Sequence, residues 1–341
     1  MDSSLPPGGR GLQQKGLGPK EWAILYHASL APSGHNSQPW CVRINDPREW
    51  VVGADQKRGL KVVDPENREM LLSIGAFLEN LVQAAKSYGY DPRVKVIGRS
   101  RFDQDLARVR LLAIVPNQAS LSRITLRRTV KSNLKPGEIG SADIKAFNKA
   151  VGDGFYYFPR NSGHGRLMAE SAVENFKRQF ENKAAMEEAA FWTRLSDRDA
   201  KKFRDGLTTD GMEINGVIGW GVRTFMKSRD VTGETWRKKA VEKVAAQAGQ
   251  GGGWVVITSR GNSVADLIDT GRRFQRMALL ARERNIGIHP MTQSLEEPHG
   301  QKTIQENHDA SMVPQFMLRV GYLDQYPDPV SLRRPVHWFL V

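Results

Sequence analysis

The segment LAPSGHNSQPW, residues 30–40, limits the possible folds and functions of this chain more than any other segment does. It follows a helix-like stretch, KEWAILYHASL (20–30), in which Trp22, Leu25 and Leu30 recur at helical spacing. Pro, Ser, Gly and Asn are ordinary turn residues. A turn that also carries His, Asn and Gln within four positions, and then Trp, is unusual. Polar donors and acceptors beside a rigid apolar block suit a flat heteroaromatic ligand, so we predict a binding pocket here.

Length and charge limit the class of protein. The 341 residues are enough for two domains or one large α/β unit, and 40% of them are hydrophobic, which allows a substantial core. The formal net charge of +13 favours anionic ligands in general. A nucleic-acid or acidic-surface binder is therefore a third hypothesis, resting on this charge alone. Because the basic residues are interleaved with acidic ones, we predict a solvated surface and no nucleic-acid partner.

The cysteine content and the hydropathy of the sequence indicate the cellular compartment of the protein. The single cysteine, Cys41, excludes an intrachain disulfide, so nothing favours oxidative export. No apolar stretch approaches the roughly 20 residues of a membrane span. Residues 1–20 are rich in Gly and Pro, lack an apolar signal core, and are expected to form a flexible arm. We predict a cytoplasmic protein, with export left open if a signal peptide was removed.

Hydrophobic patterning predicts alternating strands and helices. Strand candidates lie at 40–44, 60–64, 93–98, 108–116, 155–159, 251–259 and 315–323. Helix candidates lie at 65–90, 141–151, 165–191 and 263–288. Residues 116–122 have the composition of a linker, and residues 193–250 are charged, dotted with Gly and without a clear pattern.

A weak internal repeat accompanies these elements. One long helix is followed by Gly89-Tyr90-Asp91-Pro92 and the other by Gly287-Ile288-His289-Pro290. Long helices of similar pattern in both parts of the chain suggest duplication of one α+β unit. The alternative is coincidence among common helix endings.

Several motifs together resemble one known family. PSGHNSQPW (32–40) resembles the Pro-Ser-x-x-Asn-x-Gln-Pro-Trp signature of the nitroreductase superfamily of FMN proteins, and RRTVK (127–131) resembles its basic phosphate-binding signature. The stretches 253–290 and 319–335 are similar to its core strand, central helix, closing strand and basic tail. The resemblance implies an α+β fold of two pseudo-repeated halves, each with a central, mostly antiparallel sheet flanked by helices.

The order of the two signatures departs from the ordinary family pattern. Ordinary members carry the Arg-rich signature first and build flavin sites between two subunits. Here the order is reversed, which resembles the fused branch in which one chain imitates the dimer. We therefore expect a first half at 21–118 and a second half at 119–341, the latter with a lid-like insertion at about 193–250. The motifs suffice for one site, in a monomeric pseudo-dimer, with higher oligomers left open.

The resemblance also implies which residues hold FMN. A dianionic phosphate needs permanent cations. In an extended segment Arg127, Thr129 and Lys131 point to one side, and Arg128 of the same motif faces away. The alternative is a solvated basic strand. The full set of expected cofactor-binding residues is Pro32, Ser33, Gly34, His35, Asn36, Gln38, Arg127, Arg128, Thr129, Lys131, Pro290, Met291, Thr292 and Arg333.

The expected function is an FMN-dependent oxidoreductase of nitroreductase type. Hydride would pass from NAD(P)H by way of the flavin to a nitroaromatic or quinone-like small molecule. No catalytic side chain and no metal site is predicted. The alternative is a flavin-sequestering protein of the same fold, with residues 193–250 as its lid and little turnover.

Overall fold

The computed structural model describes residues 16–116, 121–307, 311 and 313–341. Most of the expected N-terminal arm and the expected boundary at 118/119 lie outside these residues. The first helix, α1 (Pro19–Ser29), begins inside the expected arm, with Pro19 in its first turn, where the missing N–H costs no hydrogen bond.

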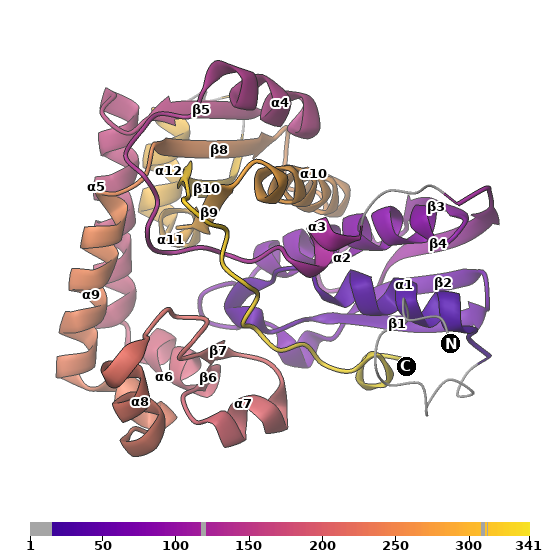
Figure 1. Cartoon of the computed structure of the whole chain (residues 1–341), viewed down its shortest axis with the longest axis horizontal. Helices are drawn as coiled ribbons and strands as arrows, with labels where there is room; N and C mark the ends of the chain where they lie inside the picture. Colours follow the sequence, from indigo (N-terminus) through magenta and orange to yellow (C-terminus); the bar gives the residue numbers. More distant parts are fainter. Residues whose placement is uncertain (1–15, 117–120, 308–310, 312) are drawn as a thin grey trace.

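The first sheet has four antiparallel strands in the order β1-β2-β4-β3. Its elements are β1 (Trp40–Asp46), β2 (Glu49–Ala54), α2 (Arg68–Ser87), β3 (Tyr90–Val96) and β4 (Asp105–Ala113), with short 3₁₀ turns η2 (Gly34–Asn36) and η3 (Gln56–Arg58). Helices α1 and α2 pack on one face of it (Figure 1). The exposed alternate positions of β4 mark its other, solvent-facing side.

The strand expected at 60–64 is wrong. This segment is a turn, in which the backbone N–H of Asp64 donates to the Leu60 carbonyl at 2.8 Å. The Asp64 carboxylate then accepts the N–H of Met70 at 3.0 Å, which satisfies one of the free donors at the start of α2. The strand that completes the sheet is β2, whose last five residues are all buried.

The second sheet is also antiparallel, in the order β5-β8-β10-β9. Its elements are α3 (Ser122–Thr125), α4 (Ser141–Val151), β5 (Phe155–Pro159), β8 (Gly253–Ser259), α10 (Val264–Glu283), β9 (Ile286–Pro290), α11 (Gln293–Glu296), α12 (Pro298–Glu306) and β10 (Val313–Tyr322). Every residue of β8 is buried. Val255 and Ile257 face the main core, whereas Trp254 and Val256 face the smaller core on the opposite side of the sheet.

The two sheets have the same topology. If β1, β2, β3 and β4 correspond to β5, β8, β9 and β10, both sheets place their strands in the order first, second, fourth, third. A 20-residue helix joins the second strand to the third in each, α2 in one and α10 in the other. The predicted fold class, two pseudo-repeated α+β halves with antiparallel sheets, is confirmed.

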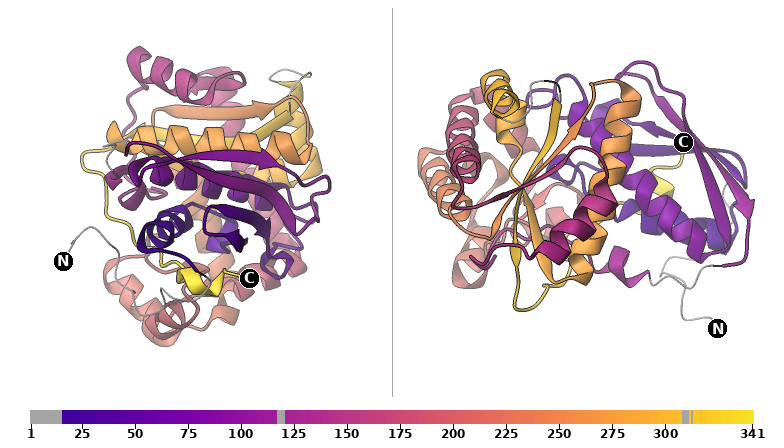
Figure 2. Two further views of the ribbon diagram at one scale, coloured as in Figure 1. Left: turned by 90° about the vertical axis from the view of Figure 1, so that its right-hand side faces the viewer. Right: turned by 90° about the horizontal axis from the view of Figure 1, so that it is seen from above.

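Helices α2 and α10 pack against each other between the sheets, as the view from above shows (Figure 2). They meet at Gly75 and Gly271, each the eighth residue of its helix. A Cβ on Gly75 would lie 2.2 Å from the Ile268 carbonyl oxygen, and one on Gly271 would lie 2.0 Å from that of Leu72. The equivalent positions of the two glycines place the crossing on the pseudo-twofold axis.

A large helical segment separates β5 from β8. It contains α5 (Gly163–Glu181), α6 (Lys183–Phe191), β6 (Thr193–Arg194), α7 (Asp197–Phe203), β7 (Leu207–Thr208), α8 (Gly216–Phe225), η4 (Ser228–Thr232) and α9 (Glu234–Ala248). The single helix expected at 165–191 is interrupted at Asn182, whose side-chain oxygen accepts the N–H groups of Ala184 and Ala185 and so begins α6. Helices α5 and α9 lie side by side at the edge of the molecule (Figure 1).

The tail, residues 323–341, returns from the second sheet to the first and is drawn in yellow in Figures 1 and 2. The tail passes through η5 (Val336–Trp338) and then reaches β1, where the N–H of Val42 donates to the Phe339 carbonyl at 2.8 Å. The N–H of Val341 donates to the Val42 carbonyl at 3.0 Å. The tail thus pairs with the edge strand β1 and ties the halves together. None of the described helices combines the length and apolar character that a membrane crossing requires.

Candidate functional site

A cavity of about 390 Å³ lies where the two halves meet the helical segment. The first half contributes residues 30–36 and the beginning of α2. The second half contributes residues 124–131, the turn after β9 and the tail, while α5 and residues 206–211 add a further wall. Its volume lies in the range of small-molecule and cofactor sites.

The signature loop, residues 30–40, reaches the cavity in a strained conformation. His35, Asn36 and Gln38 have φ angles of 48°, 51° and 53°, in the left-handed region that non-glycine residues rarely adopt. Gly34 has a different constraint, because a Cβ there would lie 3.0 Å from Leu60 Cδ1 and 3.1 Å from Glu69 Oε2. Three residues with strained backbone within the span 34–38 are typical of ligand clamps, and such strain requires support from neighbouring groups.

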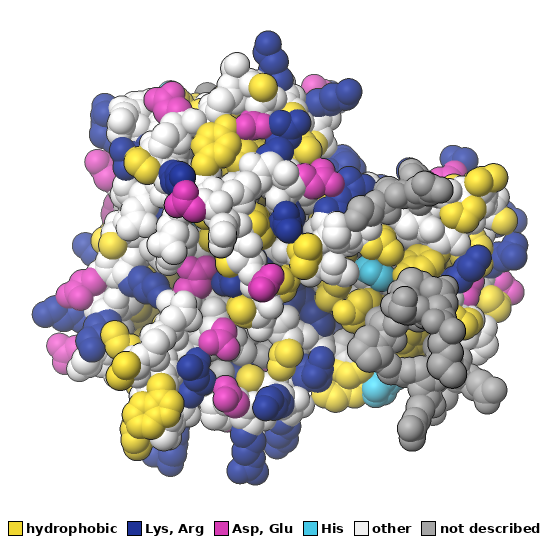
Figure 3. Space-filling view, viewed as in Figure 1, with side chains coloured by type: hydrophobic (Ala, Val, Ile, Leu, Met, Phe, Trp, Pro, Cys, Tyr) yellow, Lys and Arg dark blue, Asp and Glu magenta, His cyan; other side chains and the backbone are white. Residues whose placement is uncertain are grey.

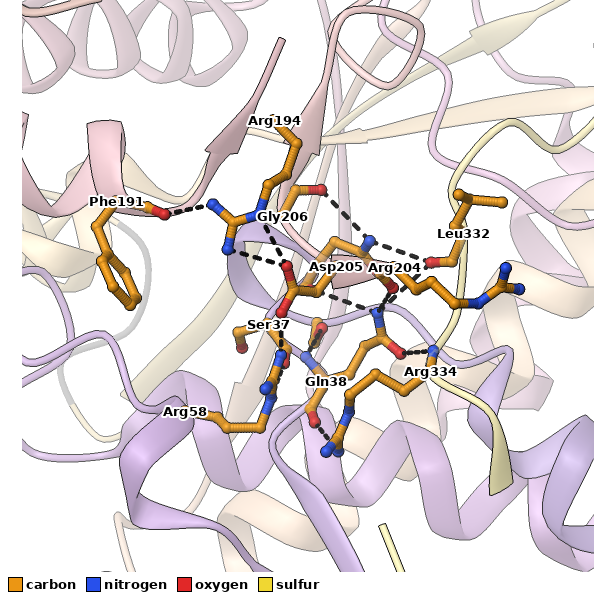
Figure 4. A network of polar contacts seen from close by, with 12 residues as sticks. Ser37, Gln38, Arg58, Phe191, Arg194, Arg204, Asp205, Gly206, Leu332 and Arg334 are labelled. Carbon is orange, nitrogen blue, oxygen red and sulfur yellow. Dashed lines mark hydrogen bonds and ion pairs between the residues drawn. The ribbon is translucent and has the colours of Figure 1, made fainter. Parts of the chain in front are cut away.

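Gln38 supplies much of that support. Its side-chain Nε2 donates to the Arg204 carbonyl at 2.8 Å, and its Oε1 accepts the backbone N–H of Arg334 at 2.8 Å (Figure 4). Its own N–H donates to Ser33 Oγ at 2.9 Å. Gln38 is fully buried and does not line the cavity, so its contacts are those of a brace.

Asn36 lines the cavity but is also tied to the surrounding backbone. Its Nδ2 lies 3.3 Å from both the Gly206 and the Leu332 carbonyl oxygens. Its Oδ1 is buried without a hydrogen-bond partner. The amide donors of Asn36 are thus directed at the helical segment and the tail.

A buried ion cluster connects the same three parts of the chain. Asp205 forms ion pairs with Arg194, at 3.0 Å, and with Arg58 (Figure 4). Arg58 Nε also donates to the Ser37 carbonyl at 2.6 Å, and Arg204 Nε donates to the Arg333 carbonyl at 2.8 Å. This cluster fixes the loop, the helical segment and the tail relative to one another.

Three of the residues that line the cavity are the cations Arg127, Lys131 and Arg333. Arg127 donates from Nη2 to the Leu30 carbonyl at 3.1 Å, and Arg333 donates to the Ala31 carbonyl at 3.2 Å. The Nε atoms of both are buried without a partner. Among the residues that the structure describes, neither of these arginines nor the Lys131 ammonium group has a carboxylate within ion-pair distance. Buried cations left in this state attract an anion.

Burial lowers the pKa of each of these groups. Burial and the Arg127 charge lower the pKa of Arg333 to about 9, and burial also lowers the pKa of Arg127. For Lys131, burial is the main cause of a pKa of about 8, opposed by Glu213 and reinforced by Lys243 and Arg128. A bound anion would favour the charged form of all three and so oppose this lowering of their pKa.

Arg128 is different, because its charge is already compensated. Its Nη2 lies 3.2 Å from the Glu213 carboxylate, and its Nη1 donates to the Asp328 carbonyl at 2.8 Å. Glu213 also accepts the backbone N–H of Lys131 at 2.9 Å. Arg128 lines the cavity, but its guanidinium group already binds Glu213 and the Asp328 carbonyl.

The cavity is also lined by two carboxyl groups that the motifs did not predict, Glu69 and Glu296. Glu69 Oε1 forms an ion pair with Arg68 at 3.1 Å. The Glu296 carboxyl is hydrogen-bonded to Thr292 Oγ1, at 3.0 Å, and to Gln179 Nε2. Burial, followed by the Glu69 charge, raises the pKa of Glu296 to about 8.

His289 is a further missed residue. Its Nδ1 lies 3.0 Å from Arg319 Nη2, and since a guanidinium only donates, Nδ1 accepts and the ring hydrogen lies on Nε2. Burial and the Arg319 charge hold the pKa of His289 well below its usual value, so the ring is neutral. The apolar residues that line the cavity are Leu72, Ala76, Ile124, Phe176, Phe274 and Phe316.

The structure therefore brings most of the expected residues together. Those that line the cavity are Pro32, Ser33, Gly34, His35, Asn36, Arg127, Arg128, Thr129, Lys131, Pro290, Thr292 and Arg333. Met291 joins Gln38 outside it, since Met291 is fully buried in the smaller core behind the second sheet. Among the described residues no group of three or more His, Cys, Asp or Glu has an arrangement that would hold a metal ion.

The chain is similar to proteins named as NAD(P)H nitroreductases. No family model matches the chain. It is 22% identical over 325 residues, 90% of its length and 89% of the relative's, to a Serratia sp. (strain ATCC 39006) protein named as a probable NAD(P)H nitroreductase, PigM. A Mycobacterium tuberculosis (strain CDC 1551 / Oshkosh) protein whose name is also that of an NAD(P)H nitroreductase is 31% identical over 124 residues, 36% of each chain. The solved FMN-dependent nitroreductase NfnB of Mycobacterium smegmatis, in complex with NADPH, aligns with 61% of this chain and 93% of its own at 15% identity and a TM-score of 0.38.

Proposed function

Because the chain belongs to the nitroreductase superfamily, we propose that it is an FMN-dependent oxidoreductase that uses NAD(P)H to reduce a nitroaromatic or quinone-like small molecule. The observation that carries this proposal is that three cations lining a partly apolar cavity, Arg127, Lys131 and Arg333, have no ion-pair partner among the residues that the structure describes. A phosphate and a flat ring joined by a flexible chain fit that distribution of charge and apolar surface.

The residues present fit FMN. Arg127 and Arg333 have buried Nε–H groups without acceptors, and a phosphate is the kind of anion that guanidinium groups bind. Lys131 and Thr129, which also line the cavity, add an ammonium group and a hydroxyl. The apolar wall formed by Phe176, Phe274, Phe316 and their neighbours suits the ring, with the strained loop at 33–36 against its edge. Bound there, FMN would supply a two-electron carrier.

The chain's own residues position and isolate this reaction. The ion cluster around Asp205 holds the signature loop against the tail, and Phe176 and Gln179 of α5 line the cavity, where they would cover part of a bound ligand. Excluding water strengthens the interactions of the enclosed charges. One site per chain is supported by the single occurrence of each motif, since the first half contributes the loop and the second half the cations.

The alternative, a flavin-sequestering protein, is favoured by one observation, the wall that residues 206–211 and α5 place over the cavity. On the face seen in Figure 3, basic side chains are scattered among acidic ones, which gives no support to a nucleic-acid function.

The visible spectrum of the purified, FMN-reconstituted protein and a steady-state assay test the proposal. We expect flavin absorbance that stays with the protein through desalting, and consumption of NADH or NADPH that depends on an added quinone. Retained flavin without turnover would favour sequestration. Failure to retain flavin would refute both functions.

A further inference from the structure

Glu296 occupies an unusual place in the cavity wall. It is the last residue of α11, on the turn that follows β9, and within the described part of the chain its carboxyl is hydrogen-bonded to the neutral side chains of Thr292 and Gln179. Arg68, the positive charge that acts on it, is already paired with Glu69. A carboxyl in such surroundings gains little from ionising and retains its proton.

Glu69 has the opposite environment, although it lines the same cavity. It lies in the first turn of α2, where the helix dipole favours negative charge, and it pairs with Arg68 at 3.1 Å. Its charge disfavours a second charge on Glu296. Together with burial, this raises the pKa of Glu296 to about 8, with Arg68 and the hydrogen bonds from Gln179 and Thr292 opposing the rise. Two carboxyl groups with contrasting environments are a typical acid–base arrangement in enzymes.

We propose, on the basis of the function proposed above, that Glu296 is the catalytic acid that protonates a quinone-like acceptor during its reduction. A hydride consists of two electrons and one proton, and here it originates from NAD(P)H. A quinone that receives this hydride becomes a hydroquinone anion. The Glu296 O–H bond breaks as the new phenol O–H bond forms, which gives the neutral hydroquinone. Glu296 is left as a carboxylate and recovers its proton from water.

The imidazoles at the cavity are less suitable donors. His289 is neutral, and its pKa lies well below the usual value because it is buried beside Arg319. Burial also lowers the pKa of His35. A neutral imidazole N–H is a far weaker acid than a carboxyl O–H, so compared with these two imidazoles Glu296 combines a retained proton with adequate acidity.

The test separates acceptors that need a proton from one that does not. The FMN-loaded protein is reduced anaerobically with dithionite and then mixed with a soluble quinone or with ferricyanide, which takes up electrons alone. Glu296→Gln should slow quinone reduction about a hundredfold, as expected for a lost general acid, and change ferricyanide reduction by less than about twofold. Glu297→Gln, the adjacent carboxyl outside the cavity, should change neither rate.

Equal slowing with both acceptors, or no slowing with quinone, would overturn the proposal. A wild-type protein that reduces neither acceptor would instead refute the proposed function itself. If Glu296→Gln does not fold, Glu69→Gln provides the second variant. Removing the negative charge beside Glu296 should lower its pKa, so the pH above which quinone reduction declines should move to lower values. An unmoved or raised pH profile would contradict the acid role.

The protonation of Glu296 can also be measured in the absence of flavin and turnover, from the carboxyl ¹³C NMR spectrum of the apo-protein labelled at glutamate. One carboxyl resonance should titrate near pH 8 and be missing from the spectrum of Glu296→Gln. If the resonance that this substitution removes titrates near the ordinary glutamate pKa, Glu296 holds no proton at neutral pH and the proposal fails.

Discussion

Arg127 and Arg128 are adjacent in sequence, yet the structure predicts opposite consequences when each is replaced by Met, which keeps the aliphatic stem and removes the charge. Arg127 is buried and without an ion-pair partner among the described residues, whereas Arg128 is paired with Glu213. Arg127→Met should therefore weaken FMN binding and leave the apo-protein at least as stable as before. Arg128→Met should mainly destabilise the fold.

The magnitudes follow from the contacts. A charge-assisted hydrogen bond from Arg127 to the phosphate is worth roughly 1.5–3 kcal/mol, about tenfold to a hundredfold in affinity. Only 12% of the Arg128 side chain and 10% of the Glu213 side chain are exposed. Breaking a pair this deeply buried leaves Glu213 with the Lys131 N–H and the charges of Lys131 and Lys243 but without its ion-pair partner, which costs up to about 3–5 kcal/mol of folding free energy.

The assays are FMN titration of each apo variant and urea unfolding of the same samples. The expected result is that the two variants exchange rank, with Arg127→Met the weaker FMN binder and Arg128→Met the less stable fold. Equal losses of affinity would mean that the basic segment acts as a diffuse field. A larger loss of stability in Arg127→Met would refute the argument that its charge is uncompensated.

Other predictions concern titration, packing and the signature loop. Since burial lowers the pKa of Lys131 to about 8, the ammonium form is lost as pH rises through that value, and FMN affinity measured by titration should fall above pH 8 in wild type but not in Lys131→Met. Gly75→Ala places a Cβ 2.2 Å from the Ile268 carbonyl and should lower the unfolding free energy by about 1–3 kcal/mol or more, whereas Gly137→Ala, where a Cβ meets nothing within 4 Å, should not. Asn36→Ala should lower the melting temperature and weaken FMN binding without changing the flavin potential; a lowered potential at normal FMN content would place its amide at the ring.

Local patterns predicted the secondary structure where one periodicity dominated. The helix expected at 141–151 has those bounds in the structure. The long helices expected at 65–90 and 263–288 are present but shorter, and the last residues of the expected ranges belong to strands β3 and β9. The errors occurred where a side chain competes with the regular backbone pattern. Asp64 turns a strand-like segment into the start of a helix, and Asn182 divides a continuous helical pattern by capping a new helix.

The candidate site was predictable where a motif is contiguous. Residues 32–36 and 127–131 meet in one cavity although about ninety positions separate them. Glu69 and Glu296 were not found, because their significance depends on a long-range contact between α2 and the turn after β9. The available signal was that Glu296 follows Thr292, an expected site residue, by four positions. Likewise, nothing local distinguishes Gln38, a buried brace, from the cavity-lining residues beside it.

The central claim is that the two halves of one chain build a single FMN site. The most direct measurement is the ratio of flavin to chain after reconstitution, desalting and denaturation of the wild-type protein. The account predicts one FMN per chain, because the signature loop and the uncompensated cations each occur once. A reproducible ratio of two would contradict the single shared site, and a ratio of zero would contradict the FMN function.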